Sequence, residues 1–148
     1  MKRKIMIVIL LAICATGLWF FQVSGKSVET PREIPASPEQ KKELQTALSV
    51  IEQAFGSNNT ATVSQLYGLS DRERKAAECE TGVDPVRAGM EQLGGFGRKL
   101  KVENAAFLAV DRMPARFYIT GDLCDGRTVR FTLNRTKRGL RLNEVVVR

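Results

Sequence analysis

Few residues of this 148-residue chain have types and spacings that could carry out chemistry. Histidine is absent, which excludes Ser-His-Asp and Cys-His nucleophiles and removes the commonest metal ligand. Asp122 alternates with apolar residues of a predicted strand and should point outwards, and Asp111 precedes Arg112-Met113-Pro114 in a predicted turn. Neither aspartate suits a general base. We therefore predict no catalytic residue, no metal site and no cofactor, and do not expect an enzyme.

Cys79 and Cys124 are the two thiols that follow the N-terminal apolar segment. In an oxidising compartment, an even pair most simply forms a disulfide. Such a bond would close a loop of about 45 residues and stabilise a small domain by about 3–4 kcal/mol. Two free buried thiols, or a reactive thiol at Cys124 in its predicted turn, are the alternatives. No Cys-x-x-Cys pair is present, so a dithiol oxidoreductase is not expected.

The N-terminal segment predicts where the rest of the chain lies. Ile5 to Val23 contains 19 residues without a charge and directly follows Lys2-Arg3-Lys4. A run of this length can cross a bilayer as a helix, and the preceding cations hold its start in the cytoplasm. We therefore expect residues 1–25 to form a single-pass anchor in a bacterial-type inner membrane. Everything after Gly25 would then lie on the periplasmic side.

Cleavage at Gly25 is the alternative, and it would release a periplasmic or secreted protein. The small residues Ser24 and Gly25 suit a signal peptidase, but the apolar run exceeds the ~7–15 residues of a signal peptide. Its outer end also holds Trp19, Phe20 and Phe21, and aromatic residues favour the membrane–water interface. These features favour an uncleaved anchor.

Charge is distributed unevenly along the chain. Residues 26–97 hold 8 basic and 11 acidic residues, a net charge of −3, whereas residues 98–148 hold 12 basic and 5 acidic residues, a net charge of +7. A basic half outside the cytoplasm suggests envelope proteins or an anionic envelope surface as partners. A solvated basic sheet without a partner is the alternative. Nucleic acid is not expected as a partner, because export removes this surface from most of it.

Composition and periodicity predict one small domain after a spacer. Residues 26–37 contain Pro31 and Pro35 with few large apolar side chains, which is typical of a semi-stiff tether. Helical spacing of apolar residues then predicts a helix over 38–55 and shorter helices near 61–67, 71–79 and 85–93. Ser37 and Ser70 each begin a capping box. Residues 38–148 are therefore expected to form the domain.

From about residue 100 the apolar period becomes two, which predicts strands. The first strand should run from Leu100 to Val110 with a bulge near Ala105, and Pro114 should break it. A three-residue loop, for instance one with Gly126 in the left-handed position, should join the next two strands, because a two-residue turn would mix their faces. The alternating apolar positions of the later strands are Phe117, Ile119, Gly121 and Leu123, then Val129, Phe131 and Leu133, then Leu140, Leu142, Val145 and Val147.

Helices followed by an antiparallel meander indicate an α+β domain with helices on one face of a curved sheet. In this arrangement the chain resembles the nuclear-transport-factor-like superfamily, the cystatin-like α+β roll. The resemblance rests on the helix ending in Glu52-Gln53-Ala54-Phe55, the short helix 61–67 and the closing segment 139–147, where Leu140 replaces a common Trp. It covers about residues 38–147 and implies a cone-like roll. The superfamily includes isomerases, dehydratases, ligand binders and scaffolds of membrane machines, so it does not fix a function.

The leading functional hypothesis is a non-enzymatic, membrane-tethered interaction domain. Arg116, Arg130 and Arg141 could lie together, exposed and unpaired, on the outward face of the sheet, with Tyr118 as an aromatic contact. A homodimer through the sheet is a further expectation. A solvated face shielded by Asp122 is the alternative to any partner contact.

A small-ligand-binding domain is the second hypothesis, with an apolar pocket between helices and sheet. Its predicted lining consists of large apolar residues from both layers, Phe55, Phe107, Phe117, Ile119, Phe131 and Leu133. The same residues would form an ordinary core if the interior is closed.

Overall fold

The computed structural model describes residues 30–57, 59–93 and 99–148. The predicted anchor Ile5 to Val23 and the cleavage position Gly25 lie outside the described residues. Within the described ranges, no helix is both long and apolar enough to cross a bilayer. Contacts divide the chain into two units, and the domain considered below is the unit Pro31–Arg148.

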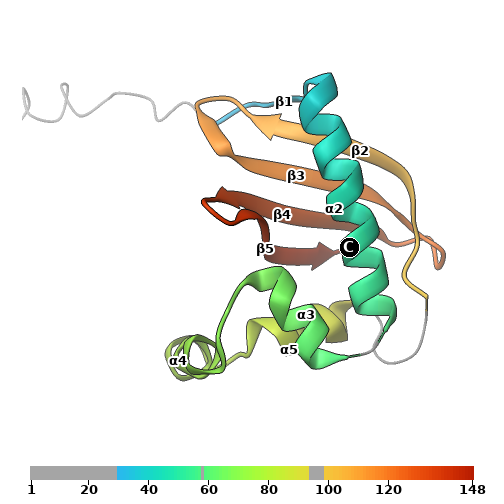
Figure 1. The fold of residues 1–148 in the computed structure, drawn as a ribbon. Helices are drawn as coiled ribbons and strands as arrows, with labels where there is room; N and C mark the ends of the chain where they lie inside the picture. Colours follow the sequence, from blue (N-terminus) through green and yellow to red (C-terminus); the bar gives the residue numbers. More distant parts are fainter. Residues whose placement is uncertain (1–29, 58, 94–98) are drawn as a thin grey trace, which may run out of the picture. The chain divides into compact units, whose positions relative to one another are not determined.

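The domain is α+β, as predicted, and the described residues form four helices and a five-stranded antiparallel sheet. The helices are α2 (Pro38–Gly56), α3 (Thr60–Tyr67), α4 (Asp71–Thr81) and α5 (Pro85–Gln92). The strands are β1 (Glu33–Pro35), β2 (Val102–Val110), β3 (Met113–Leu123), β4 (Thr128–Thr136) and β5 (Gly139–Val147), and they are neighbours in that order. Helix α2 crosses one face of the sheet, and α3, α4 and α5 gather beyond β5 (Figure 1).

Side-chain caps explain where the helices begin. Ser37 accepts a hydrogen bond from the Gln40 backbone while the Gln40 side chain accepts one from the Ser37 backbone, which confirms the first capping box. Ser70 and Glu73 form the second box at the start of α4 in the same way. Each box satisfies two backbone N–H groups that a helix start would leave unpaired.

The predicted hairpin between β3 and β4 is confirmed. The backbone N–H of Leu123 donates to the carbonyl of Arg127, and Asp122 lies opposite Thr128, so three residues form the loop. Gly126 has a φ of 83°, the left-handed conformation that this loop requires. The register keeps Phe117, Ile119 and Leu123 of β3 on the buried face.

Two sequence-based expectations about strands are wrong. Residues 33–35, expected to belong to the spacer, form strand β1 and pair with Val110, Ala109 and Leu108 of β2. All three β1 residues are exposed, so no apolar pattern marked them as a strand. Pro114 does not break a strand but lies inside β3, next to the Asp111-Arg112 turn. Proline is tolerated there because it is close to the beginning of the strand.

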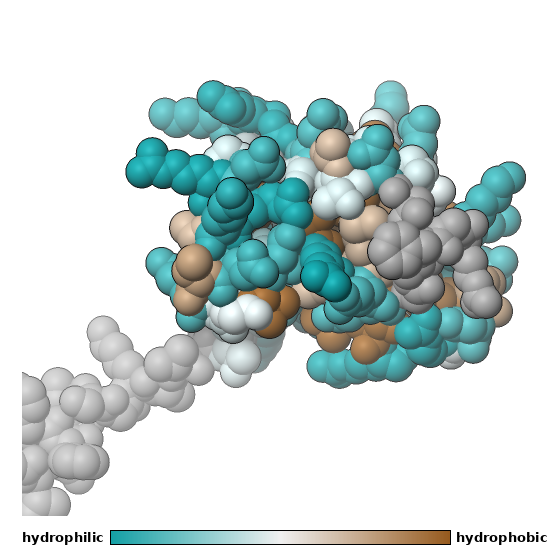
Figure 2. Space-filling model, turned by 90° about the horizontal axis from the view of Figure 1, so that it is seen from below, coloured by the Kyte–Doolittle hydropathy of each residue, from teal (hydrophilic) through white to brown (hydrophobic). Residues whose placement is uncertain are grey.

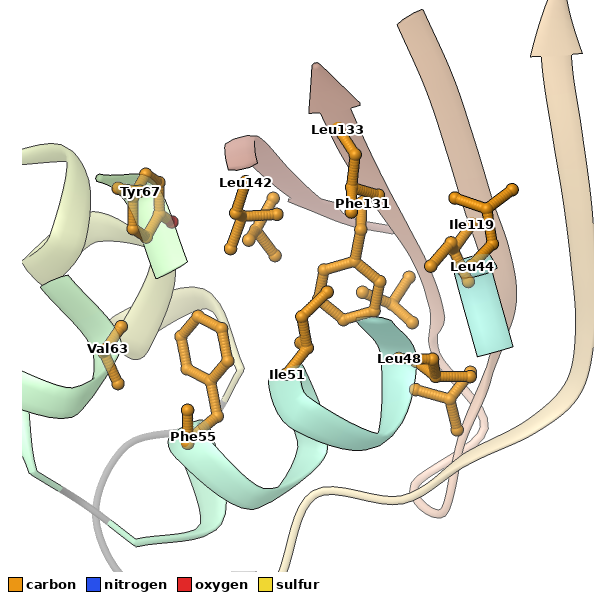
Figure 3. Close-up of a cluster of buried hydrophobic side chains, with 14 of the residues drawn as sticks. Leu44, Leu48, Ile51, Phe55, Val63, Tyr67, Ile119, Phe131, Leu133 and Leu142 are labelled. Carbon is orange, nitrogen blue, oxygen red and sulfur yellow. The ribbon is translucent and has the colours of Figure 1, made fainter. Parts of the chain in front are cut away.

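The core lies between α2 and the sheet. In Figure 3, Leu44, Leu48 and Ile51 of α2 point toward Ile119 and Phe131, and Phe55 points toward Val63 of α3. Nine large side chains are almost completely buried, namely Phe117, Phe131, Leu44, Ile51, Ile119, Leu133, Val63, Val86 and Val129. Their burial fixes α2 on one face and leaves the opposite face of the sheet to polar side chains.

Candidate functional site

The face of the sheet opposite α2 carries a shallow hollow of about 680 Å³. Its lining comes mainly from β3, β4 and β5, with Asn104 from β2, and it is predominantly polar. The charged lining residues are Arg116, Asp122, Arg130, Glu144 and Arg148, and the uncharged ones include Asn104, Tyr118, Thr120, Thr128, Thr132 and Asn143. Three of these five charges are cations, and Arg116, Tyr118 and Arg130 are residues that the sequence analysis singled out.

Arg130 lines the hollow from β4 and is already paired. Its guanidinium carbon lies 3.8 Å from the centroid of the Tyr118 ring, which is a cation–π contact. The same guanidinium forms an ion pair with Glu33 of β1. Partial burial is the largest single effect and lowers the pKa of Arg130, but the hydrogen bonds and charges of Glu33 and Tyr118 together outweigh it, so the pKa is raised. The expectation of an unpaired Arg130 is therefore wrong.

Arg116 differs from Arg130 because no described carboxylate pairs with it. It is half-buried in β3 and lies opposite Asn134 of β4. Among the described residues that line the hollow, Arg116 is therefore the cation that lies on a central strand and has no carboxylate partner. A ligand anion would meet this guanidinium without having to displace a carboxylate.

Asp122 closes one end of the hollow and points outwards, as predicted. Its carboxylate accepts a hydrogen bond of 3.0 Å from the side-chain amide of Asn104. Asn104 has a φ of 51° and lies in a bulge of β2, where the register shifts between Glu103 and Ala106. This confirms the bulge expected near Ala105 and shows that Asp122 holds a structural contact.

Arg141 does not join Arg116 and Arg130. Its guanidinium donates a hydrogen bond of 2.8 Å to the carbonyl of Gln65 in α3, and its side-chain stem lies against Gly68. Strand β5 is the edge next to α3, and the register between β4 and β5 shifts after Thr132. The side chain therefore reaches the helices from the edge of the sheet.

Arg148 lines the hollow but was missed by the sequence reasoning. Its backbone exchanges two hydrogen bonds of 2.9 Å with Thr128, which extends the pairing of β4 and β5 by one residue. The signal was present in the alternation of Glu144, Val146 and Arg148, which all line the hollow. Arg148 follows the last apolar residue of the strand, Val147, so the apolar pattern alone does not mark it.

The predicted disulfide is not formed. Cys79 in α4 and Cys124 in the β3–β4 loop are both free and exposed. Figure 1 places these two elements at opposite ends of the domain. The disulfide was predicted only from the oxidising compartment and the even number of cysteines. A disulfide also requires the two Cα atoms to lie within about 7 Å of each other. The two thiols are available to solvent instead.

A partly buried ion pair joins α4 to α5. Arg74 and Asp84 approach to 2.5 Å, and their side chains are only 18% and 15% exposed. Asp84 also accepts a hydrogen bond from the backbone of Val86 and so caps α5. The hydrogen bond from Arg74 is the main reason that the pKa of Asp84 is lowered. Arg74 and Asp84 neutralise each other, and Asp84 also caps α5. This pair therefore has a structural role.

A second hollow of about 840 Å³ lies between α2, α3 and the beginning of β5. Its apolar lining includes Ala47, Val50, Leu66 and Leu140, and Arg141 lies among the polar lining residues. Of the six residues predicted to line a ligand pocket, only Leu133 borders this groove, and Phe55, Phe117, Ile119, Phe131 and Leu133 are all buried in the core. The groove therefore lies beside the predicted apolar pocket between helices and sheet, and not within it.

The other described surfaces give weaker candidates for a binding site. Seen from the side of α3, α4 and α5, the described surface is mainly hydrophilic, and its hydrophobic areas are small and separate (Figure 2). Among the described residues, no group of three or more cysteines, aspartates and glutamates is arranged to hold a metal ion. The polar hollow and the groove beside α2 are thus the two concave sites that can be argued from the described residues.

Comparisons of the chain with protein-family models, with curated proteins and with solved structures found no match. The resemblance to the nuclear-transport-factor-like superfamily stays a prediction.

Proposed function

We propose that the chain is a non-enzymatic, membrane-tethered interaction domain of a bacterial-type cell envelope. In this proposal Ile5 to Val23 anchors the chain in the inner membrane, and residues 31–148 bind a partner outside the cytoplasm. The domain would be a cone-like α+β roll of the nuclear-transport-factor-like kind. The resemblance supports a scaffold role only in a general way, since that superfamily has many functions.

The observation that carries the proposal is the guanidinium of Arg116 in the polar hollow, with which no carboxylate of the described residues pairs. It lies beside Tyr118 and Arg130, whose ring and guanidinium are already stacked, so this part of the surface is pre-organised. Arginine binds carboxylates with two parallel hydrogen bonds, and an ordered site loses little entropy on binding. The partner that fits best is an acidic segment of an envelope protein.

The hollow's own carboxylates restrict which partners can bind. Asp122 and Glu144 line the hollow together with the cations, so they would repel a uniformly anionic polymer. A protein segment can place its carboxylate opposite Arg116 and its own polar or basic groups opposite Asp122 and Glu144. This pattern favours a protein over an anionic polymer as the occupant of the hollow.

Affinity purification of the full chain from envelope membranes tests the proposal. Arg116→Gln should remove a defined set of co-purifying envelope proteins. Arg72→Gln, which removes an exposed charge from α4, should retain that set. Loss of the same proteins from both variants would indicate a general charge effect, and retention by Arg116→Gln would remove the hollow as the binding site.

Tethering has its own test. Residues 1–25 are replaced by a cleavable export signal, which releases the domain in soluble form. The proposal expects the soluble form to lose its biological role while it still binds the partner. Full function of the soluble form would remove the tether from the proposal.

A second candidate function is the binding of a small apolar molecule in the groove beside α2. Val50 in that groove is 49% exposed although it is large and apolar. Val50→Glu should abolish binding of a fluorescent hydrophobic probe, whereas Val83→Glu, at an equally exposed valine outside the groove, should not. Equal binding by both variants would remove this candidate.

A further inference from the structure

The two hairpin turns at one end of the sheet carry a concentration of cations. The β2–β3 turn contains Asp111 and Arg112, and the β4–β5 turn contains Lys137 and Arg138. Val110 pairs with Met113 and Thr136 pairs with Gly139, so each turn has two residues. All four turn residues are exposed, and Asp111 is the single carboxylate among them.

Strand β1 begins at the same end. The backbone N–H of Asp111 donates to the carbonyl of Arg32 at 2.8 Å, which places Arg32 beside the β2–β3 turn. We define the basic end as Arg32, Arg112, Met113, Lys137 and Arg138. Figure 1 shows both hairpin turns on the side of the sheet where β1 begins, and the β3–β4 turn on the other side.

Exposed apolar side chains accompany these cations. Only four large hydrophobic residues are well exposed in the described chain, and two of them, Met113 and Ile34, belong to this end. Met113 is 39% exposed and follows Arg112 directly, and Ile34 of β1 is 44% exposed. Cations beside exposed apolar side chains are typical of surfaces that bind the interface of an anionic membrane.

The length of the chain places this end near the bilayer if the anchor is inserted. Nine residues, 24–32, separate the predicted anchor from the beginning of β1 at Glu33. Fully extended, they span at most about 32 Å. With the anchor inserted, the beginning of β1 therefore lies within about 32 Å of the membrane surface.

We propose that the basic end docks on the anionic phospholipid headgroups of the membrane that holds the anchor. This inference rests on the tether in the proposed function, but it concerns a different surface from the polar hollow. Lys137 and Arg138 supply charge to the lipid phosphates, and Met113 enters the interfacial region. Docking orients the sheet so that the β3–β4 turn is directed away from the bilayer.

The test uses the full chain reconstituted in vesicles, with Trp19→Phe removing the single native tryptophan. Met113→Trp then supplies a reporter at the basic end, and lipids brominated on their acyl chains quench it on contact. We expect quenching in vesicles rich in phosphatidylglycerol and little in vesicles of phosphatidylcholine alone. Equal quenching in both lipids, or none in either, would overturn the proposal.

Paired variants separate charge at this end from charge in general. Lys137→Gln with Arg138→Gln should weaken docking about 25-fold, since each cation near an anionic surface contributes about five-fold, or about 1 kcal/mol. Lys99→Gln with Lys101→Gln removes two exposed cations just before β2, at the other end of the sheet, and should leave quenching unchanged. An equal loss from both pairs would overturn docking by the basic end.

Extraction of the same vesicles with alkaline carbonate separates this proposal from the tether. A chain that is washed off would remove the anchor, and docking would fail with it. A chain that stays in the vesicles with an unquenched reporter would overturn docking alone and leave the anchor in place.

Discussion

The phenol oxygen of Tyr67 in α3 lies so close to Gly89 in α5 that a Cβ on Gly89 would be 2.4 Å from it. The two helices can approach this closely only because residue 89 has no side chain. Burial of the phenol raises the pKa of Tyr67, and the charges of Asp84 and Glu144 raise it further. The phenol therefore stays protonated, and its contact with Gly89 fixes α5 against α3.

Gly89→Ala should destabilise the domain by about 1–3 kcal/mol, because the added methyl group overpacks a closed contact. Denaturant unfolding measures the change. Gly56→Ala is the control, since a Cβ there would meet its nearest neighbours at 3.8 and 3.9 Å, and it should be neutral or stabilising. In a Tyr67→Phe background the nearest ring atom is 3.6 Å away, so Gly89→Ala should cost less. An unchanged cost would mean that the hydroxyl is not the obstacle.

The Arg74–Asp84 pair should make stability depend on pH. The pKa of Asp84 is lowered in the folded state, so the pair stabilises the fold above the unfolded pKa of about 4. That contribution is lost as the pH falls through the lower folded pKa. Asp84→Asn should therefore destabilise the domain by about 1–2 kcal/mol at pH 7, and the difference from the wild type should shrink below pH 4.

Asp71→Asn is the matched control for that prediction. Asp71 lies 3.8 Å from the same arginine, but its side chain is 95% exposed. Exposed pairs contribute little, so this variant should stay within about 0.5 kcal/mol of the wild type at every pH. Thermal unfolding at several pH values measures both variants, and parallel curves for the two would contradict the assignment.

Arg130→Gln should lower stability by about 1 kcal/mol, because it removes both the stack on Tyr118 and the ion pair with Glu33. Arg138→Gln, at an exposed turn, should change stability by less than about 0.5 kcal/mol. A double-mutant cycle with Glu33→Gln isolates the ion pair from the stack. A cycle without coupling would show that Glu33 contributes nothing to the fold.

Both thiols should react in the folded protein. A membrane-impermeant maleimide should label Cys79 and Cys124 without prior reduction, because each is free and exposed. Cys79→Ser and Cys124→Ser should each shift stability by less than about 0.5 kcal/mol. Labelling that appears only after treatment with a reductant would show that a disulfide had formed.

Sequence reasoning was accurate where a local rule decides the structure. The capping boxes at Ser37 and Ser70 depend on residues three apart, and the left-handed Gly126 follows from matching the faces of two adjacent strands. Alternation also placed Asp122 on the outward face. Such features need no knowledge of what packs against them, so the α+β class could be predicted from the sequence.

The sequence-based predictions were wrong where a structural feature depends on residues far apart in the sequence. Strand β1 exists because Glu33–Pro35 pairs with residues about 75 positions later, and its exposed side chains carry no pattern. Arg141 follows the alternation of β5, but the neighbouring helix α3 offers a carbonyl that draws its side chain away from Arg116. Arg130 finds Glu33 across the sheet in the same way. Partners of this kind cannot be inferred from spacing alone.

Strand β1 also decides how the sheet can meet other chains. It covers residues 108–110 of β2, and the bulge between Glu103 and Ala106 distorts the other half of that strand. The three-residue β1 ends in Pro35, which has no N–H to offer to a further strand. Along this side the sheet has no long, regular row of backbone groups on which a foreign strand could align. This edge of the sheet is thereby protected against edge-to-edge pairing, and proteolytic removal of the residues around Glu33 would weaken that protection.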